Sequence, residues 1–151
     1  MSKTSAILQT IDHPCKLWLV ALTLSIALVL APAPLSAADD AIEQTIESQI
    51  LAFQADDAIS AYSFAAPSIK SIFPTPDIFM RMVKQGYQPV YRPQSFQFAE
   101  REVIGDQTVQ FVDLIGPKGG AWRAMYSLQQ QADGTWKITG VQLQKGNDAA
   151  V

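Results

Sequence analysis

Cysteine and histidine are nearly absent from this chain of 151 residues, which contains one of each, Cys15 and His13. Residues 39–151 therefore offer neither imidazole nor thiol. This excludes a Ser-His-Asp triad, a cysteine nucleophile, a His- or Cys-ligated zinc and a His-held haem from that part of the chain. No disulfide can form there, so the hydrophobic core has to hold the fold unaided. We expect no cofactor and no metal.

Runs of basic residues are also missing. The chain has 11 Lys and Arg against 14 Asp and Glu, a net charge of −3 at pH 7. A mildly acidic domain without a basic patch lacks the positive surface that binds phosphate backbones, so nucleic acid is not an expected partner. The expected partners are a small molecule or a protein, including a second copy of the chain in a homodimer.

The N-terminal part has the layout of a secretory signal peptide. Lys16 precedes an apolar block at residues 17–30, and a run of mostly small residues follows at 31–38. As a helix the block would span about 21 Å, short of the roughly 30 Å hydrocarbon core, so cleavage is favoured over permanent anchoring. We predict a signal peptide at 1–38, one domain at 39–145 and a disordered tail at 146–151. The expected location is periplasmic or secreted, without stable membrane insertion after cleavage.

Apolar residues recur at steps of three and four after residue 39, which predicts helices. One apolar stripe follows Ile42, Ile46, Ile50 and Phe53, and a second short helix is expected over 58–66. A third helix is predicted over 75–86, where a threonine N-cap precedes a proline and a glycine follows the periodic residues. Residues 87–93 are expected to form an extended connector, because prolines keep the residues before them out of the helical region.

The period changes to two after residue 93, which predicts strands. Glycine-containing turns divide this part into alternating segments at 96–101, 108–115, 122–128 and 136–143. Strands joined by short turns form an antiparallel meander. Gly140 breaks the alternation of the last strand and indicates a β-bulge. The order predicts an α+β domain, with N-terminal helices packed on one face of a curved four-stranded antiparallel sheet.

Three segments carry a more specific resemblance: AFQADDA at 52–58, AYSFAAPSI at 61–69 and GYQPVYRP at 86–93. They resemble the bacterial family named domain of unknown function 4864, over residues 42–143. The element order is similar to that of the cone-shaped nuclear-transport-factor-2-like (NTF2-like) fold, which SnoaL-type polyketide cyclases and ketosteroid isomerases share. The resemblance implies a fold and supplies no substrate or catalytic residue.

Asp113 is the candidate catalytic residue, because it shares a strand face with Val109 and Phe111. If that face lines the cone, apolar surroundings would raise the pKa of the carboxyl toward general acid-base use. The favoured alternative is a position at the strand end beside water, or an ion pair with a cross-strand arginine such as Arg123.

Tyr87, Tyr91 and Arg92 are candidate ligand-binding residues, because a phenol and a guanidinium on the connector could hold a carboxylate or carbonyl group. Structural roles are favoured for them, with the tyrosines covering the sheet and Arg92 capping a helix or pairing with an aspartate.

Three further aromatic residues on the predicted strands are either a stacking platform for a flat ligand or ordinary core: Trp122, Tyr126 and Trp136. Asp56 and Asp57 suggest a metal-binding carboxylate pair, but a capping role between two helices is favoured because adjacent side chains diverge on a helix.

The sequence thus leaves two hypotheses, of which the first is favoured: a non-catalytic binding or interaction module, and an isomerase- or cyclase-type enzyme that uses Asp113 with a tyrosine. They differ in whether the concave face of the sheet encloses a pocket containing Asp113 or is filled by the aromatic residues.

Overall fold

The computed structural model describes residues 35–146, all of which belong to one compact unit. Five helices precede four strands along the chain: α1 (Leu35–Gln54), α2 (Ala58–Ser63), α3 (Pro67–Ile72), α4 (Pro76–Gly86), α5 (Gln88–Tyr91), β1 (Ser95–Ile104), β2 (Gln107–Ile115), β3 (Ala121–Gln130) and β4 (Trp136–Lys145). Helix α1 begins within the last residues of the predicted leader. The rest of the leader and almost all of the predicted tail lie outside the described residues.

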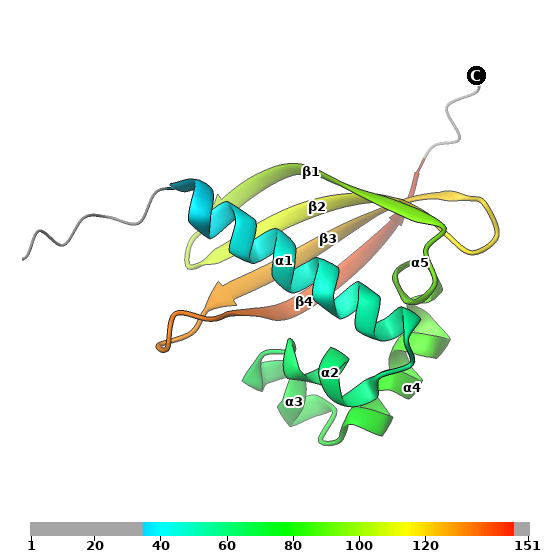
Figure 1. Ribbon diagram of the computed structural model, residues 1–151, viewed down its shortest axis with the longest axis horizontal. Coiled ribbons are helices and arrows are strands. Elements are labelled where there is room, and N and C mark those ends of the chain that lie inside the picture. The colour runs from blue at the N-terminus through cyan, green and yellow to red at the C-terminus, as the bar shows by residue number, and fades with distance from the viewer. Residues whose placement is uncertain (1–34, 147–151) are drawn as a thin grey trace, which may run out of the picture. The chain divides into compact units, whose positions relative to one another are not determined.

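The strands form one antiparallel sheet in the order β1-β2-β3-β4, as the glycine-containing turns predict (Figure 1). The predicted bulge in the last strand is confirmed. Ser127 pairs with Gly140 and Leu128 with Ile138, which leaves Thr139 as the extra residue. An α+β arrangement with helices packed on the sheet is therefore observed.

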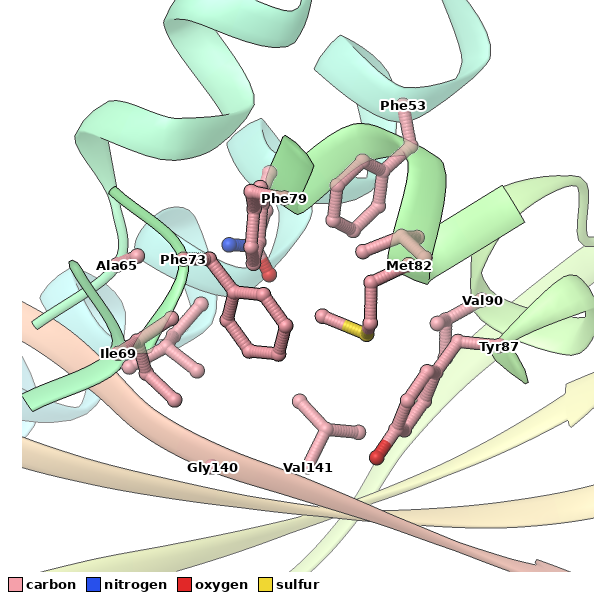
Figure 2. Close-up of a pocket in the computed structure, with 13 residues that line it drawn as sticks. Phe53, Ala65, Ile69, Phe73, Phe79, Met82, Tyr87, Val90, Gly140 and Val141 are labelled. Carbon is pink, nitrogen blue, oxygen red and sulfur yellow. The ribbon is translucent and has the colours of Figure 1, made fainter. Parts of the chain in front are cut away.

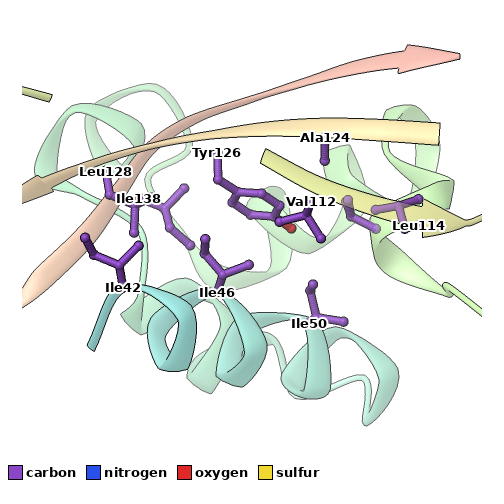
Figure 3. Close-up of a cluster of buried hydrophobic side chains, with 10 residues drawn as sticks. Ile42, Ile46, Ile50, Val112, Leu114, Ala124, Tyr126, Leu128 and Ile138 are labelled. Atoms are coloured by element: carbon purple, nitrogen blue, oxygen red, sulfur yellow. The ribbon is translucent and has the colours of Figure 1, made fainter. Parts of the chain in front are cut away.

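Helix α1 lies along one face of the sheet, which we call the inner face (Figure 1). Its isoleucines at steps of four pack against inner-face side chains of the strands (Figure 3). Ile46 and Ile50 are 0 % exposed. Burial of such a side chain contributes about 1.5–3 kcal/mol, so this contact is the main hydrophobic core of the domain.

Helices α2, α3 and α4 form a helical lobe beside the C-terminal half of α1 (Figure 1). The start of α4 matches its prediction: Thr75 Oγ1 accepts a hydrogen bond from the backbone N–H of Ile78 at 3.3 Å, and Pro76 occupies the first turn. The lobe has a second hydrophobic cluster, in which Phe79 contacts Phe53, Tyr62 and Phe73 at ring centroid distances of 5.6–6.3 Å.

Two helical segments were not expected from the sequence. Helix α3 extends over Pro67–Ile72, and the predicted extended connector at 87–93 contains the short helix α5. Pro67 and Pro89 sit in the first turns of these helices, where the missing N–H removes no helical hydrogen bond. Proline therefore begins helices at both places, and the prediction of an extended connector was wrong.

The side chains of Gln110 and Arg101 connect strand β1 to strand β2 and to helix α1. A bulge in β1 leaves Ala99 and Glu100 without regular partners, and Nε2 of Gln110 donates to their carbonyl oxygens at 3.0 and 3.3 Å. Oε1 of the same amide accepts from Arg101 Nε at 2.6 Å. The Arg101 guanidinium also pairs with Asp39 and with a second carboxylate of α1. A buried glutamine thus replaces the strand hydrogen bonds that the bulge removes.

Candidate ligand-binding cavity

A cavity of about 180 Å³ separates the two hydrophobic clusters. Its walls come from α1, α4, α5 and β4 and from the segment that contains α3 (Figure 2). The residues that line it are Gln49, Phe53, Ala65, Ile69, Phe73, Phe79, Met82, Val83, Tyr87, Val90, Ile138, Gly140 and Val141. Half-buried side chains, among them Met82, Tyr87 and Val141, mark the side on which the cavity meets solvent. The cavity is therefore accessible to a small molecule.

Helix periodicity positions the walls. Phe79, Met82 and Val83 lie on one face of α4, and Gln49 and Phe53 are one turn apart on α1. The hydroxyl of Tyr62 donates to the carbonyl oxygen of Phe73 at 2.6 Å, which holds the segment between α3 and α4 against α2. The aromatic side of the cavity is therefore fixed before any ligand arrives.

The opposite side of the cavity is formed by β4. The backbone of Ile138 accepts a hydrogen bond from Ala66 N at 2.8 Å and donates to Phe64 O at 2.9 Å, which ties the helical lobe to the first half of the strand. Beyond the bulge, the side chain of Val141 points into the cavity (Figure 2). Gly140 contributes no side chain, so the cavity remains open beside it.

The lining is apolar apart from two side chains, Gln49 and Tyr87. Gln49 is 2 % exposed, and its Nε2 donates to the carbonyl oxygen of Ala61 at 3.2 Å. Of the described residues that line the cavity, none is Asp, Glu, His, Lys or Arg. The cavity therefore has the composition of a binding site for uncharged molecules, with few polar groups to orient them.

Tyr87 is the one predicted ligand-binding residue, among the six proposed from the sequence, that lines this cavity. Tyr91 and Arg92 instead bind Asp56, which follows the end of α1 by two residues and has a positive φ of 58°. The Tyr91 hydroxyl donates to Oδ1 of Asp56, Arg92 approaches Oδ2 at 2.6 Å, and Lys84 approaches Oδ1 at 2.9 Å. The hydrogen bond from Tyr91, then that from Lys84, lowers the pKa of Asp56 to about 2. This group anchors α4 and α5 to the end of α1.

Asp57 caps α2, as its position between two helices predicts. Its Oδ1 accepts from the backbone N–H of Ser60 at 3.0 Å, and hydrogen bonds from Ser60 lower the pKa of this carboxyl. The two aspartates therefore have separate structural roles. Among residues 35–146 no group of three or more His, Cys, Asp and Glu side chains is arranged to hold a metal ion.

Asp113 lies on the outer face of the sheet, with Val109 and Phe111, and outside the cavity. Arg123, its cross-strand partner, donates to both carboxylate oxygens at 2.7 and 2.9 Å and also pairs with Glu100. The exposed ion pair is the alternative favoured by the sequence. Both carboxylate oxygens are occupied by Arg123 on a face that does not line the cavity, so Asp113 is not placed to act as a general base there.

The three strand aromatics belong to the inner face of the sheet. Tyr126 is 0 % exposed beneath α1 (Figure 3). Half-buried Trp122 and Trp136 pack against the same cluster. They contribute to the core, and Trp122 at its edge also lines two surface hollows, one of them beside Asp113. Core side chains therefore fill the space between α1 and the sheet, as the binding-module hypothesis expects. The cavity lies beside this core, and Asp113 does not line it.

Gln49 is the site residue that sequence reasoning missed. It follows Ile46 by three residues, so the helical period places it on the buried face of α1, where glutamine is uncommon. That polar position within an apolar stripe was the available signal. The rest of the cavity comes from segments between residues 49 and 141 that are distant in sequence.

The family model described as Domain of unknown function (DUF4864) matches residues 35–151. This match confirms the resemblance seen in the sequence. No curated protein matches the chain.

Two solved structures show the same architecture. An NTF-2 like protein of unknown function from Silicibacter pomeroyi is 14 % identical, with a TM-score of 0.54 over 75 % of this chain and 99 % of that one. A counterpart from Shewanella baltica, also of unknown function, is 10 % identical, with a TM-score of 0.53 over 78 % of this chain and 100 % of that one. At these identities the likeness establishes the fold alone, and it confirms the NTF2-like expectation.

Proposed function

The chain belongs to the DUF4864 family and has an NTF2-like fold, and on that premise we propose that it is a non-catalytic binding module for a small apolar molecule. The observation that carries this proposal is the cavity between the two hydrophobic clusters. An engineered apolar cavity of about 150 Å³ stays dry and binds benzene. A cavity of about 180 Å³ with a similar lining offers the same gain to a molecule of that class.

Binding is favoured over catalysis by the chemistry of the walls. General acid-base catalysis needs a group whose pKa lies near the working pH and which reaches the reacting atoms. No Asp, Glu, His, Lys or Arg is among the described lining residues, so Tyr87 has no acid or base beside it in the cavity. Asp113, the candidate base of the enzyme hypothesis, is paired with Arg123 on the other face of the sheet.

A cavity-filling variant tests the proposal. Val141→Phe adds volume where the side chain points into the cavity, and Val109→Phe makes the same change on the outer face of the sheet. Saturation-transfer NMR with toluene should detect saturable binding to the wild type and to Val109→Phe, and at least tenfold weaker binding to Val141→Phe. No binding to the wild type, or equal binding to both variants, contradicts the proposal.

Export belongs to the same proposal. It rests on the apolar block and the small residues behind it, which lie largely outside the described residues. Among residues 35–146 no helix is long and apolar enough to span a bilayer. N-terminal sequencing of material from the periplasm or medium should begin close to Asp39, whereas an intact Trp18 in that material would contradict cleavage.

A further inference from the structure

We infer that the ligand is an uncharged apolar alcohol or phenol, about the size of one substituted ring, whose hydroxyl donates a hydrogen bond to Oε1 of Gln49. This inference rests on the proposed binding function and specifies its ligand. Three features of the cavity carry it: the orientation of the Gln49 amide, the absence of charge from the described lining residues, and the volume.

The orientation of the amide follows from its partner. The carbonyl oxygen of Ala61 can only accept, so the atom of Gln49 that faces it at 3.2 Å has to be Nε2. Oε1 then points away from α2, and in the described part of the chain no donor reaches it. Gln49 is 2 % exposed and lines the cavity. Oε1 is not one of the fully buried atoms that lack a partner, so it is reached from the cavity, and its hydrogen bond comes from the water or the ligand held there.

A buried acceptor selects for a donor. An aprotic ligand that displaces water from Oε1 leaves this oxygen unpaired, which is unfavourable, whereas a ligand that supplies a hydroxyl or N–H replaces the lost hydrogen bond. Tyr87 does not substitute for such a donor, because its hydroxyl makes no hydrogen bond with Gln49 in the structure. The ligand is therefore the expected hydrogen-bond donor to Oε1 of Gln49.

The lining also limits charge and size. A carboxylate or ammonium group in the cavity would lose its hydration without meeting an opposite charge, since no ionised side chain is among the described lining residues. The cavity, at about 180 Å³, is slightly larger than one of about 150 Å³ that binds benzene, so it suits one ring with a small substituent. An aliphatic amine, which is charged at neutral pH, is excluded by the same desolvation, and a hydroxyl is the smallest uncharged donor that remains.

The test compares four compounds that share a methyl-substituted ring and differ in the group opposite the methyl: hydrogen in toluene, hydroxyl in p-cresol, methoxyl in 4-methylanisole and carboxylate in 4-methylbenzoate. Dissociation constants come from chemical-shift titrations of the wild type at pH 7. We expect p-cresol to bind about three- to tenfold more tightly than toluene and 4-methylanisole, as one net hydrogen bond provides. The benzoate should bind at least tenfold more weakly than toluene. Equal binding of p-cresol and 4-methylanisole contradicts the donor inference without any variant.

A pair of variants assigns the preference to the amide. Gln49→Leu removes Oε1, and Gln44→Leu makes the same change at an exposed position of α1. The preference for p-cresol over toluene should disappear in Gln49→Leu and persist in Gln44→Leu. If toluene binds the wild type but the preference is missing or survives Gln49→Leu, the ligand class is wrong while the binding function stands. If no probe binds, both proposals fail.

Discussion

Replacing Tyr126 with phenylalanine should stabilise the domain, although it removes a polar group from the middle of the core. The side chain is 0 % exposed, and its hydroxyl has no hydrogen-bond partner among the described residues. Burial raises the pKa of this phenol, because the apolar surroundings disfavour its charged form. Figure 3 shows the ring between the strands and the isoleucines of α1.

The expected magnitude follows from the opposing effects of removing one oxygen atom. An unsatisfied buried hydroxyl is unfavourable by about 1–3 kcal/mol. The small void that the oxygen leaves offsets a few tenths of a kcal/mol, at about 24 cal/mol per Å³. Tyr126→Phe should therefore raise the free energy of unfolding by about 1 kcal/mol and the melting temperature by roughly 4 °C.

Urea unfolding followed by circular dichroism measures the change in the free energy of unfolding. The comparison holds if the variant and the wild type have the same dependence of this free energy on urea concentration. Tyr62→Phe is the matched control, because the hydroxyl of Tyr62 donates to a backbone carbonyl at 2.6 Å. The control should lose about 1 kcal/mol. A similar loss in Tyr126→Phe would refute the reasoning, because it would mean that the buried hydroxyl has a partner.

Three further predictions concern polar groups. Gln110→Met should lower the free energy of unfolding by about 3 kcal/mol in urea titrations, since it leaves the bulge carbonyls of β1 unpaired, and a loss below about 1 kcal/mol would contradict that role. Asp56 has a folded-state pKa below its unfolded value, so it contributes stability above pH 4 that is lost as pH falls toward 2. Melting curves of Asp56→Asn should lack this part of the acid destabilisation, and an unchanged pH profile would argue against the anchor. Asp113→Asn, at an exposed ion pair, should change stability by less than about 1 kcal/mol, and a rise in melting temperature of several degrees would show that the carboxylate is strained.

Local sequence chemistry was enough to predict most of the elements. The threonine-proline pair at the start of α4 and the glycine in β4 each specify a backbone geometry, and both features occur where predicted. Strand β2 shows where this reasoning ends. Its two faces carry Thr108, Gln110, Val112 and Leu114 on one side and Val109, Phe111, Asp113 and Ile115 on the other. The buried face carries two polar residues and the outer face only one, so alternation favours the wrong face.

The candidate site depended on information of another kind. The cavity exists because a helix, a loop and a strand from distant parts of the chain pack incompletely where they meet. These three segments contribute Gln49, Phe73 and Val141 to its wall. Hydrophobic periodicity identifies the side chains that face inward, but it does not give the space between two separately packed clusters. The roles of Tyr91 and Arg92 required the structure for the same reason, since their partner Asp56 is 35 residues away from Tyr91.

The cavity between the two hydrophobic clusters also divides the domain into parts that can open separately. The helical lobe reaches β4 through the short backbone pairing at Ile138, whereas α1 is packed directly on the sheet. Segments with fewer cross-contacts exchange their amide hydrogens through sub-global opening, at a lower free energy than complete unfolding. The backbone of α2–α4 can thus exchange with solvent while the sheet stays closed, and a molecule seated in the cavity would bridge the lobe to the sheet and bring the two exchange rates together.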